Sequence, residues 1–268
     1  MIRDITIGQY YPVDSVIHRL DPRVKLSGTM LFMISLFVFS GYWGYVIAAL
    51  FVGTVIKISK VPFRYIVRGL KPILFLLLFT VLLNLFLTRE GTELWSFWIF
   101  HIYDEGLIFA GLMASRLILL VLGTSLMTFT TTPNQLTDGI EKGLGFLRVI
   151  KVPVHEIAMM MSIALRFIPI LLEETDKIMK AQIARGADFE SGNLLKKAKS
   201  LVPLLVPLFI SAFRRANDLA TAMEARCYRG GDHRTKMKPL VYAKRDFAAY
   251  AVVFGYLVLC IVFGKILF

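Results

Sequence analysis

The sequence is poor in cysteine and in charged residues. Its 268 residues include two cysteines, Cys227 and Cys260, and only 19% of the residues are charged. Two isolated cysteines indicate neither a disulfide nor a metal site, and the four histidines are too scattered to add one. The low charge and a hydrophobic content of 56% also exclude an intrinsically disordered chain, which needs the opposite composition.

Acidic residues are the scarcer of the two charge types. There are 19 Asp and Glu residues against 31 Lys and Arg residues, so the formal net charge is +12. A nucleic-acid-binding protein carries such an excess on a soluble fold, whereas this chain has a mean hydropathy of +0.65. We therefore expect no nucleic-acid partner. The combination is typical of a polytopic membrane protein whose positive charges are sorted to one side.

Long uncharged runs predict membrane-spanning helices, which need about 20 apolar residues each. Residues 26–56 have basic residues on both flanks, so this run is expected to cross and return as two helices with a tip at 41–44. Three further spans are expected at residues 72–88, 106–131 and 247–264. Five spans with a cytoplasmic N-terminus satisfy the charge of every flank. The predicted fold is an all-α integral membrane protein in contact with lipid.

The segment between the fourth and fifth spans holds most of the charge. Residues 133–246 contain 19 basic and 12 acidic residues, a net charge of about +7. A segment of this length is expected to be a folded element rather than a connector. We expect three parts: residues 1–132 with four spans, a cytoplasmic helical region at 133–245, and the last span at 246–268.

Two long amphipathic helices are predicted in this region, and they end alike. Apolar stretches at 154–172 and 201–213 each continue into a mixed, charged stripe. Both close with the string Ala-x-x-Ala-Arg, and their arginines are 41 residues apart. The two triplets at these ends are Ala184-Arg185-Gly186 and Ala225-Arg226-Cys227. One such arginine can simply complement a helix dipole. The repetition favours two equivalent contacts, in which a guanidinium enters a carboxylate-bearing pocket of a partner.

An alternative is that residues 154–172 are themselves a span. That would place the second arginine triplet and the basic run 236–245 outside, against the charge rule, and residues 201–213 are too short to return. We therefore expect both helices on the cytoplasmic side. Pro169, Pro203 and Pro207 remove backbone donors and are expected to bend or break these helices, although Pro203 is equally compatible with a helix start.

Several motifs along the chain resemble the transmembrane (T) component of energy-coupling factor transporters, which are ABC-type importers of vitamins and transition-metal ions. The resemblance rests on residues 8–10, 12–15, 18–23 and 25–26, on Ser115-Arg116, on residues 130–133, and above all on the two arginine triplets. The second triplet of this family often has Ser where this chain has Cys227.

The resemblance implies a scaffold of a prokaryotic plasma membrane without catalysis of its own. Two ABC-type ATPase subunits would sit under two crossing coupling helices, each docking one triplet (residues 184–186 and 225–227), with the guanidinium of Arg185 or Arg226 in its groove. ATP and Mg²⁺ would be bound by these partners, and no cofactor by this chain, which has no G-x-x-x-x-G-K-[ST] motif. A substrate-binding membrane subunit (the S component) would pack on the membrane helices and the helix pair.

Five methionines on the predicted helices are candidates for contact with the S component. A flexible methionine surface can repack against more than one partner, although plain core filling explains at least half of such residues better. These residues are Met159, Met160, Met161, Met179 and Met223.

Two other functions remain as alternatives. A secondary transporter should carry paired acidic or broken-helix sites at mid-membrane, whereas only Arg116 is charged within the expected spans. We expect Arg116 to be snorkelling or structurally paired, with Asn84 as a possible partner. An intramembrane enzyme would have Glu173-Glu174 as its best carboxylate pair, with no matching histidine or second acidic motif nearby.

Overall fold

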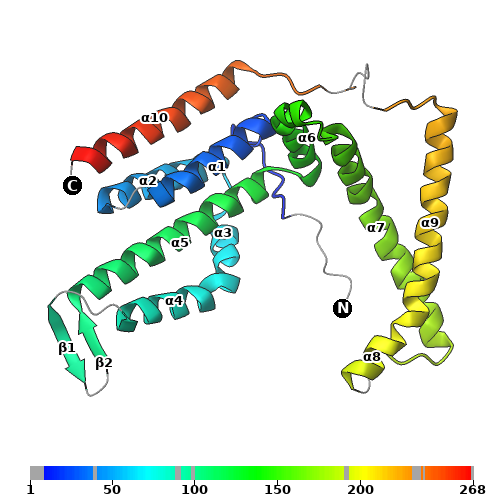
Figure 1. Cartoon of the computed structure of the whole chain (residues 1–268), viewed down its shortest axis with the longest axis horizontal. Helices are drawn as coiled ribbons and strands as arrows, with labels where there is room; N and C mark the ends of the chain where they lie inside the picture. The colour runs from blue at the N-terminus through cyan, green and yellow to red at the C-terminus, as the bar shows by residue number, and fades with distance from the viewer. Residues whose placement is uncertain are drawn as a thin grey trace. The chain divides into compact units, whose positions relative to one another are not determined.

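The structure is a computed structural model that describes residues 9–38, 41–87, 92–97, 100–189, 193–230, 237 and 239–266. The chain divides into two compact units, which are described separately (Figure 1). The described residues of the membrane unit lie within 8–142 and 240–268, and those of the helix-pair unit lie within 143–239. Gly8 of the N-terminal motif and the basic residues Lys236 and Lys238 lie outside the described residues.

The membrane unit is built from helices and one small hairpin. Its elements are α1 (Pro22–Val38), α2 (Tyr42–Ser59), α3 (Phe63–Leu70), the 3₁₀ turn η1 (Lys71–Ile73), α4 (Leu74–Leu87), β1 (Glu93–Phe97), β2 (Phe100–Tyr103), α5 (Asp104–Thr130), α6 (Pro133–Gly143) and α10 (Lys244–Ile266). The first uncharged run folds as two helices, α1 and α2, as predicted. The third expected span is preceded by α3, and Pro72 lies in the turn between α3 and α4, because proline cannot donate an α-helical hydrogen bond.

Five segments of the described chain are long and apolar enough to cross a membrane, which confirms the all-α membrane fold. They are Tyr42–Ser59, Phe63–Phe86, Asp104–Thr130, Val154–Ala184 and Lys244–Phe263. These five candidate spans differ from the five spans predicted from the sequence in a single member. Helix α1 has only 17 residues, whereas the 31-residue helix beginning at Val154 qualifies by length and hydropathy.

The loop between α4 and α5 contains a two-stranded antiparallel hairpin, which the sequence did not predict. Strands β1 and β2 pair Trp95 with Ile102 and Phe97 with Phe100, with an irregularity between Glu93 and Trp95. Alternating aromatic and polar residues are compatible with a strand, but an interfacial loop shows the same composition. Trp98, which belongs to this aromatic group, lies outside the described residues.

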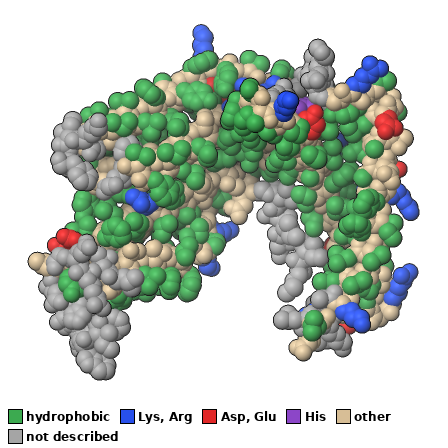
Figure 2. All heavy atoms as spheres, viewed as in Figure 1, with side chains coloured by type: hydrophobic (Ala, Val, Ile, Leu, Met, Phe, Trp, Pro, Cys, Tyr) green, Lys and Arg blue, Asp and Glu red, His purple; other side chains and the backbone are tan. Residues whose placement is uncertain are grey.

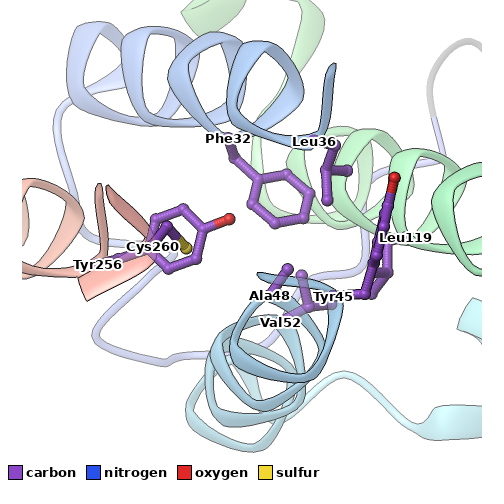
Figure 3. Packing of buried hydrophobic residues seen from close by; sticks show 8 residues of the cluster. All are labelled: Phe32, Leu36, Tyr45, Ala48, Val52, Leu119, Tyr256 and Cys260. Carbon is purple, nitrogen blue, oxygen red and sulfur yellow. The ribbon is translucent and has the colours of Figure 1, made fainter. Parts of the chain in front are cut away.

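The core of the membrane unit lies between α1, α2, α5 and α10 (Figure 3). Phe51 stacks on Tyr256 with ring centroids 4.4 Å apart, and the Tyr256 and Ser35 hydroxyl oxygens are 2.8 Å apart. Gly123 lets α5 approach α1, because a Cβ there would lie 2.7 Å from a ring carbon of Phe32. Outside this core, the α4 side chains Leu74, Phe75 and Phe79 are exposed, as expected of a surface that faces lipid. Hydrophobic side chains dominate the visible face of this unit (Figure 2).

Arg116 is paired, but not with Asn84. Its Nε donates to the Tyr45 hydroxyl at 2.8 Å, and its guanidinium lies over the Phe37 ring at 5.4 Å from the centroid. Asn84 instead donates to the backbone carbonyl of Thr80 in its own helix. The expectation of a structural pairing is therefore right, while the choice of Asn84 is wrong. A tyrosine offers both a hydroxyl and a π-face to the cation.

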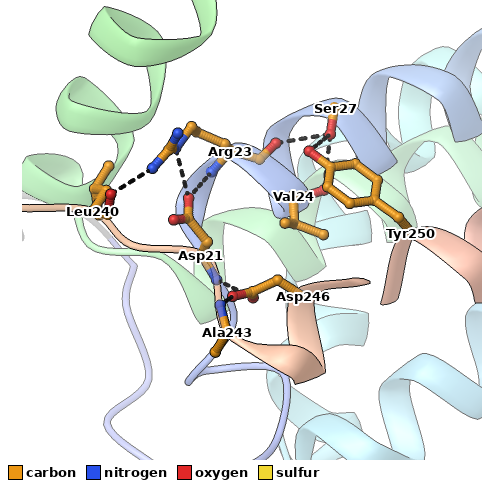
Figure 4. Close-up of polar contacts among 8 residues, drawn as sticks. All are labelled: Asp21, Arg23, Val24, Ser27, Leu240, Ala243, Asp246 and Tyr250. Atoms are coloured by element: carbon orange, nitrogen blue, oxygen red, sulfur yellow. Dashed lines mark hydrogen bonds and ion pairs between the residues drawn. The ribbon is translucent and has the colours of Figure 1, made fainter. Parts of the chain in front are cut away.

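The start of α1 is tied to the start of α10 by a polar network (Figure 4). The Asp21 N–H donates to Asp246 Oδ1 at 2.9 Å, and the Ala243 N–H donates to Asp246 Oδ2 at 2.7 Å. Arg23 donates to Asp21 Oδ1 and to the Leu240 carbonyl, and its guanidinium lies 4.3 Å from the centroid of the Tyr242 ring. The motif at residues 18–23 thus closes the bundle by joining segments that are more than 200 residues apart.

His18 belongs to the same N-terminal motif and is held neutral. Its Nε2 lies 3.1 Å from the Tyr11 carbonyl, so Nε2 carries the proton, and Nδ1 accepts from the Ser15 hydroxyl at 2.7 Å. Burial, together with the positive charge of Lys25, lowers the pKa of His18. The Lys25 ammonium itself donates to the His18 and Thr130 carbonyls, which joins the N-terminal segment to the end of α5.

The helix-pair unit contains the turn η2 (Leu144–Ile150), α7 (Val154–Ala184), α8 (Leu194–Ser200) and α9 (Val202–Ala225). Both predicted long helices are present and end at the predicted triplets. Pro169 and Pro207 lie inside α7 and α9 without ending either helix, so the expected break does not occur, while the alternative of a bend stays a prediction. Pro203 lies in the first turn of α9, where its missing N–H costs nothing. The helix-start interpretation of Pro203 is therefore confirmed.

Candidate functional site: two arginine-capped helix ends

Helix α7 ends at the first triplet with a residue in the left-handed conformation. Ala184 is the last helical residue, Arg185 is the C-cap, and Gly186 has φ +89°. The Gly186 N–H donates to the Ile183 carbonyl at 2.9 Å, and the Ala187 N–H donates to the Gln182 carbonyl at 2.9 Å. This is the Schellman pattern, which satisfies the last carbonyls of a helix and turns the chain away.

Helix α9 ends at the second triplet with the same geometry. Arg226 is the C-cap and Cys227 has φ +56°. The Cys227 N–H donates to the Glu224 carbonyl at 2.9 Å, and the Tyr228 N–H donates to the Met223 carbonyl at 3.0 Å. The two triplets therefore share a backbone conformation as well as a sequence pattern.

Both cap arginines are exposed, as are the small residues beside them. Among the described residues, none of the ion pairs involves Arg185 or Arg226. Each guanidinium extends from a helix end that turns sharply away, so little of the chain itself shields it. The arrangement offers two exposed, five-donor cations suited to bidentate contact with a carboxylate on another surface.

The left-handed cap explains why small residues follow each arginine, and it yields a prediction. An L-residue in this conformation costs about 1–2 kcal/mol relative to glycine. We expect Cys227→Gly to stabilise the end of α9 by roughly 0.5–1 kcal/mol, after allowing for the extra freedom of glycine in the unfolded chain. Gly186→Cys should destabilise the end of α7 by a similar amount, because a Cβ at Gly186 meets nothing within 4 Å and only the backbone is strained.

Amide hydrogen exchange at residues 184–187 and 225–228 measures both effects. Slower exchange at the α9 end in Cys227→Gly and faster exchange at the α7 end in Gly186→Cys are expected. Unchanged exchange in both variants would contradict the common cap.

Helices α7 and α9 pack antiparallel and are joined by a polar clamp. The Ser211 hydroxyl donates to Glu174 Oε1 at 2.5 Å, and Arg215 donates to Glu174 Oε2 through Nη2 at 2.8 Å and Nε at 3.2 Å. Farther along, the Gln182 amide donates to the Pro203 carbonyl at 3.4 Å. The chain thus runs down α7 and returns along α9 (Figure 1).

The clamp lies at equal sequence distances from the two cap arginines. Arg185 is 11 residues beyond Glu174 in α7, and Arg226 is 11 residues beyond Arg215 in α9. At 1.5 Å per residue each distance is about 16 Å, and the antiparallel arrangement points the two segments in opposite directions. The cap arginines therefore lie at opposite ends of the pair, on the order of 30 Å apart.

Sequence reasoning misses this clamp. The same 41-residue spacing that relates the cap arginines also relates Glu174 to Arg215, and this is the available signal. By sequence, Glu174 stands out only beside Glu173, as a carboxylate pair for catalysis. In the structure both Glu174 oxygens instead accept hydrogen bonds from α9.

Removal of the clamp should loosen the helix pair. We expect Glu174→Ala to destabilise the packing of α7 on α9 by about 1–2 kcal/mol, because two side chains of α9 lose a charged acceptor. The control is Glu173→Ala, which changes the exposed neighbour and should stay within about 0.5 kcal/mol. Hydrogen exchange along both helices measures the change. Equal protection in the two variants would contradict the role of Glu174.

The five candidate methionines are distributed over both long helices. Met159, Met160 and Met161 lie near the start of α7, and Met160 and Met161 are exposed within the unit. Met179 is about 30 Å farther along the same helix, and Met223 lies in the last turn of α9, where its carbonyl is part of the cap. Their contact with an S component stays a prediction.

The described residues contain no group of three His, Cys, Asp or Glu side chains that could hold a metal ion. Cys260 is buried in α10 and Cys227 is exposed at the α9 cap, and both are free thiols.

Comparison with known proteins identifies the family. The family described as CbiQ, Cobalt transport protein, matches residues 14–237, which includes both triplets. The chain is also 60% identical over 250 residues to the energy-coupling factor transporter transmembrane protein EcfT of Clostridium kluyveri, with 93% of each chain covered. The chain belongs to the EcfT family. The resemblance inferred from the motifs is therefore confirmed.

Other relatives extend the match to the whole length of the chain. EcfT of Heliobacterium modesticaldum is 51% identical over 267 residues, with 100% of both chains covered. EcfT of Bacillus subtilis is 49% identical over 246 residues, which cover 92% of this chain and 93% of the relative. Family membership and the five apolar helices make the chain a multi-pass membrane protein and the transmembrane component of a transporter.

Proposed function

We propose that this chain is the non-catalytic coupling subunit of an energy-coupling factor transporter for micronutrient, in particular vitamin, uptake. In this proposal two ABC-type ATPases dock on the helix pair, bind ATP with Mg²⁺ and hydrolyse it. The pair transmits their movement to a substrate-binding S component in the plasma membrane of a prokaryote. The observation that carries the proposal is the pair of exposed cap arginines, presented alike at opposite ends of one antiparallel helix pair.

The geometry supports two similar partners rather than one. Arg185 and Arg226 have the same cap conformation and lie at equal distances from the Glu174 clamp, so two copies of one kind of ATPase groove can each receive an arginine. No observation favours a secondary transporter, since Arg116 is occupied by Tyr45 and Phe37. The substrate would be selected by the S component and not by this chain.

Copurification tests the proposal. Tagged chain extracted from its native membranes in mild detergent should bring down two ATPase subunits and restore ATP hydrolysis coupled to uptake after reconstitution. Recovery of the chain without any ATPase, while it elutes as a single folded species, would overturn the assignment.

The orientation can be tested with the two natural cysteines. Cys227 is exposed and Cys260 is buried. If the helix pair faces the cytoplasm, a membrane-impermeant maleimide should label Cys227 in inside-out vesicles and leave it unlabelled in right-side-out vesicles. Cys227→Ser is the matched control and should remove the label, because Cys260 is not accessible. Equal labelling from the outside would place the pair on the wrong side for ATPase docking.

A further inference from the structure

The membrane unit contains a hollow of about 350 Å³ between α1, α2, α5 and α10. Phe32, Phe51 and Val252 line it together with other apolar residues, and Val16 and Leu20 of the turn before α1 also border it. Gly28 and Ala249 leave room between α1 and α10, since a Cβ at Gly28 would meet only Val253, at 3.5 Å. The volume lies within the range of sites that hold small molecules.

The lining favours a hydrocarbon occupant. Its exposed surface is almost entirely apolar, so water would find few partners there. An empty space of this size also forfeits dispersion contacts between the packed helices. In a unit surrounded by membrane, acyl chains are the apolar molecules at highest local concentration.

The hollow also has a cationic rim. Two basic residues, Lys25 and Arg245, are among those that line it. Lys25 is buried and already donates to two backbone carbonyls. Arg245 is exposed, and among the described residues none of the ion pairs involves it. Arg245 thus combines a place in the lining with an exposed guanidinium, which is suited to a phosphate.

We infer that this hollow is a binding site for an anionic phospholipid, with an acyl chain between α1 and α10 and the headgroup phosphate at Arg245. The site lies wholly in the membrane unit, so the inference does not depend on ATPase docking. The bound lipid would fill the space left by Gly28 and Ala249 and stabilise the bundle where Asp246 joins α10 to α1.

Native mass spectrometry of the protein released from nanodiscs tests this site. The nanodiscs contain equal parts of phosphatidylcholine and phosphatidylglycerol, and the readout is the number and headgroup of the lipids retained. Wild type should retain one lipid, with phosphatidylglycerol enriched about fivefold over phosphatidylcholine by a single arginine contact. Ala249→Phe, which fills the hollow, should lose this lipid. Ala251→Phe, at an exposed position on the same helix, should keep it.

A second pair of variants tests the headgroup without changing the hollow. Arg245→Gln should retain a lipid but lose the enrichment, and Lys244→Gln, its exposed neighbour, should keep both. Any of three results would overturn the proposal. They are a wild type that retains no lipid, equal lipid retention by Ala249→Phe and Ala251→Phe, and unchanged phosphatidylglycerol enrichment in Arg245→Gln. Displacement of a copurifying membrane protein by Ala249→Phe, with lipid retention unchanged, would assign the hollow to a protein partner and overturn it as well.

Discussion

A chain carrying both Arg185→Glu and Arg226→Glu is expected to insert into the membrane and fold, yet to support no ATP-driven uptake. Each substitution replaces an exposed cation at a helix C-terminus by an anion, so a carboxylate that had been a partner becomes a source of repulsion. The loss of one interfacial charge pair costs roughly 2–5 kcal/mol of binding. Each single variant should therefore weaken ATPase docking by at least about 30-fold, and the double variant should abolish it.

Three comparisons separate docking from folding in this experiment. Lys180→Glu makes the same charge change on an exposed position of α7 and should leave docking nearly unchanged. Arg185→Lys keeps the charge but loses the bidentate fork, so an intermediate loss is expected. Melting temperature and elution of the double variant should match the wild type within the small cost of reversed helix-end charges. Full uptake by the double variant would refute the proposed mechanism.

Asp246→Ala should produce the largest loss of stability among changes outside the helix pair. The Asp246 side chain is almost wholly buried and accepts from the N–H groups of Asp21 and Ala243. Removal of the carboxylate leaves the buried Asp21 N–H and the part-buried Ala243 N–H without an acceptor, and a fully buried donor left unpaired costs about 1–3 kcal/mol. We expect a total loss of roughly 2–4 kcal/mol, measured as the free energy of unfolding in detergent.

The control variants for Asp246 lie at the same position and two residues before it. Asp246→Asn retains one carbonyl oxygen and should lose about half as much stability. Lys244→Ala, at an exposed residue of the same helix turn, should change stability by less than about 0.5 kcal/mol. If Asp246→Ala were no less stable than Lys244→Ala, the network in Figure 4 would not be what joins α1 to α10.

The sequence predicts the helices well because their signals are local. Long uncharged runs locate α1, α2, α5 and α10, and the repeated Ala-x-x-Ala-Arg string locates the ends of α7 and α9. The positions of both triplets follow from the sequence alone. Their shared cap cannot be read from composition, because Cys227 is not a residue that normally indicates a left-handed conformation.

The errors concern pairings between distant residues. Arg116 bonds with Tyr45 rather than Asn84 although both α2 and α4 pack against α5, and hydropathy does not report which side chains of neighbouring helices meet. The contacts of Glu174 with Ser211 and Arg215 escape prediction for the same reason. A different kind of error concerns Pro169, which the sequence predicts will bend or break α7. It does not break the helix, because a single missing hydrogen bond does not end a 31-residue helix that is otherwise well formed.

The position of the Glu174 clamp has a mechanical consequence. A rigid body turns about its midpoint when its two ends are displaced equally in opposite directions, and the midpoint stays in place. Arg185 in α7 and Arg226 in α9 each lie 11 residues past the clamp, in opposite directions along the pair. In the proposed complex, partners that displace the two arginines in opposite directions across the pair would thus turn the pair about Glu174.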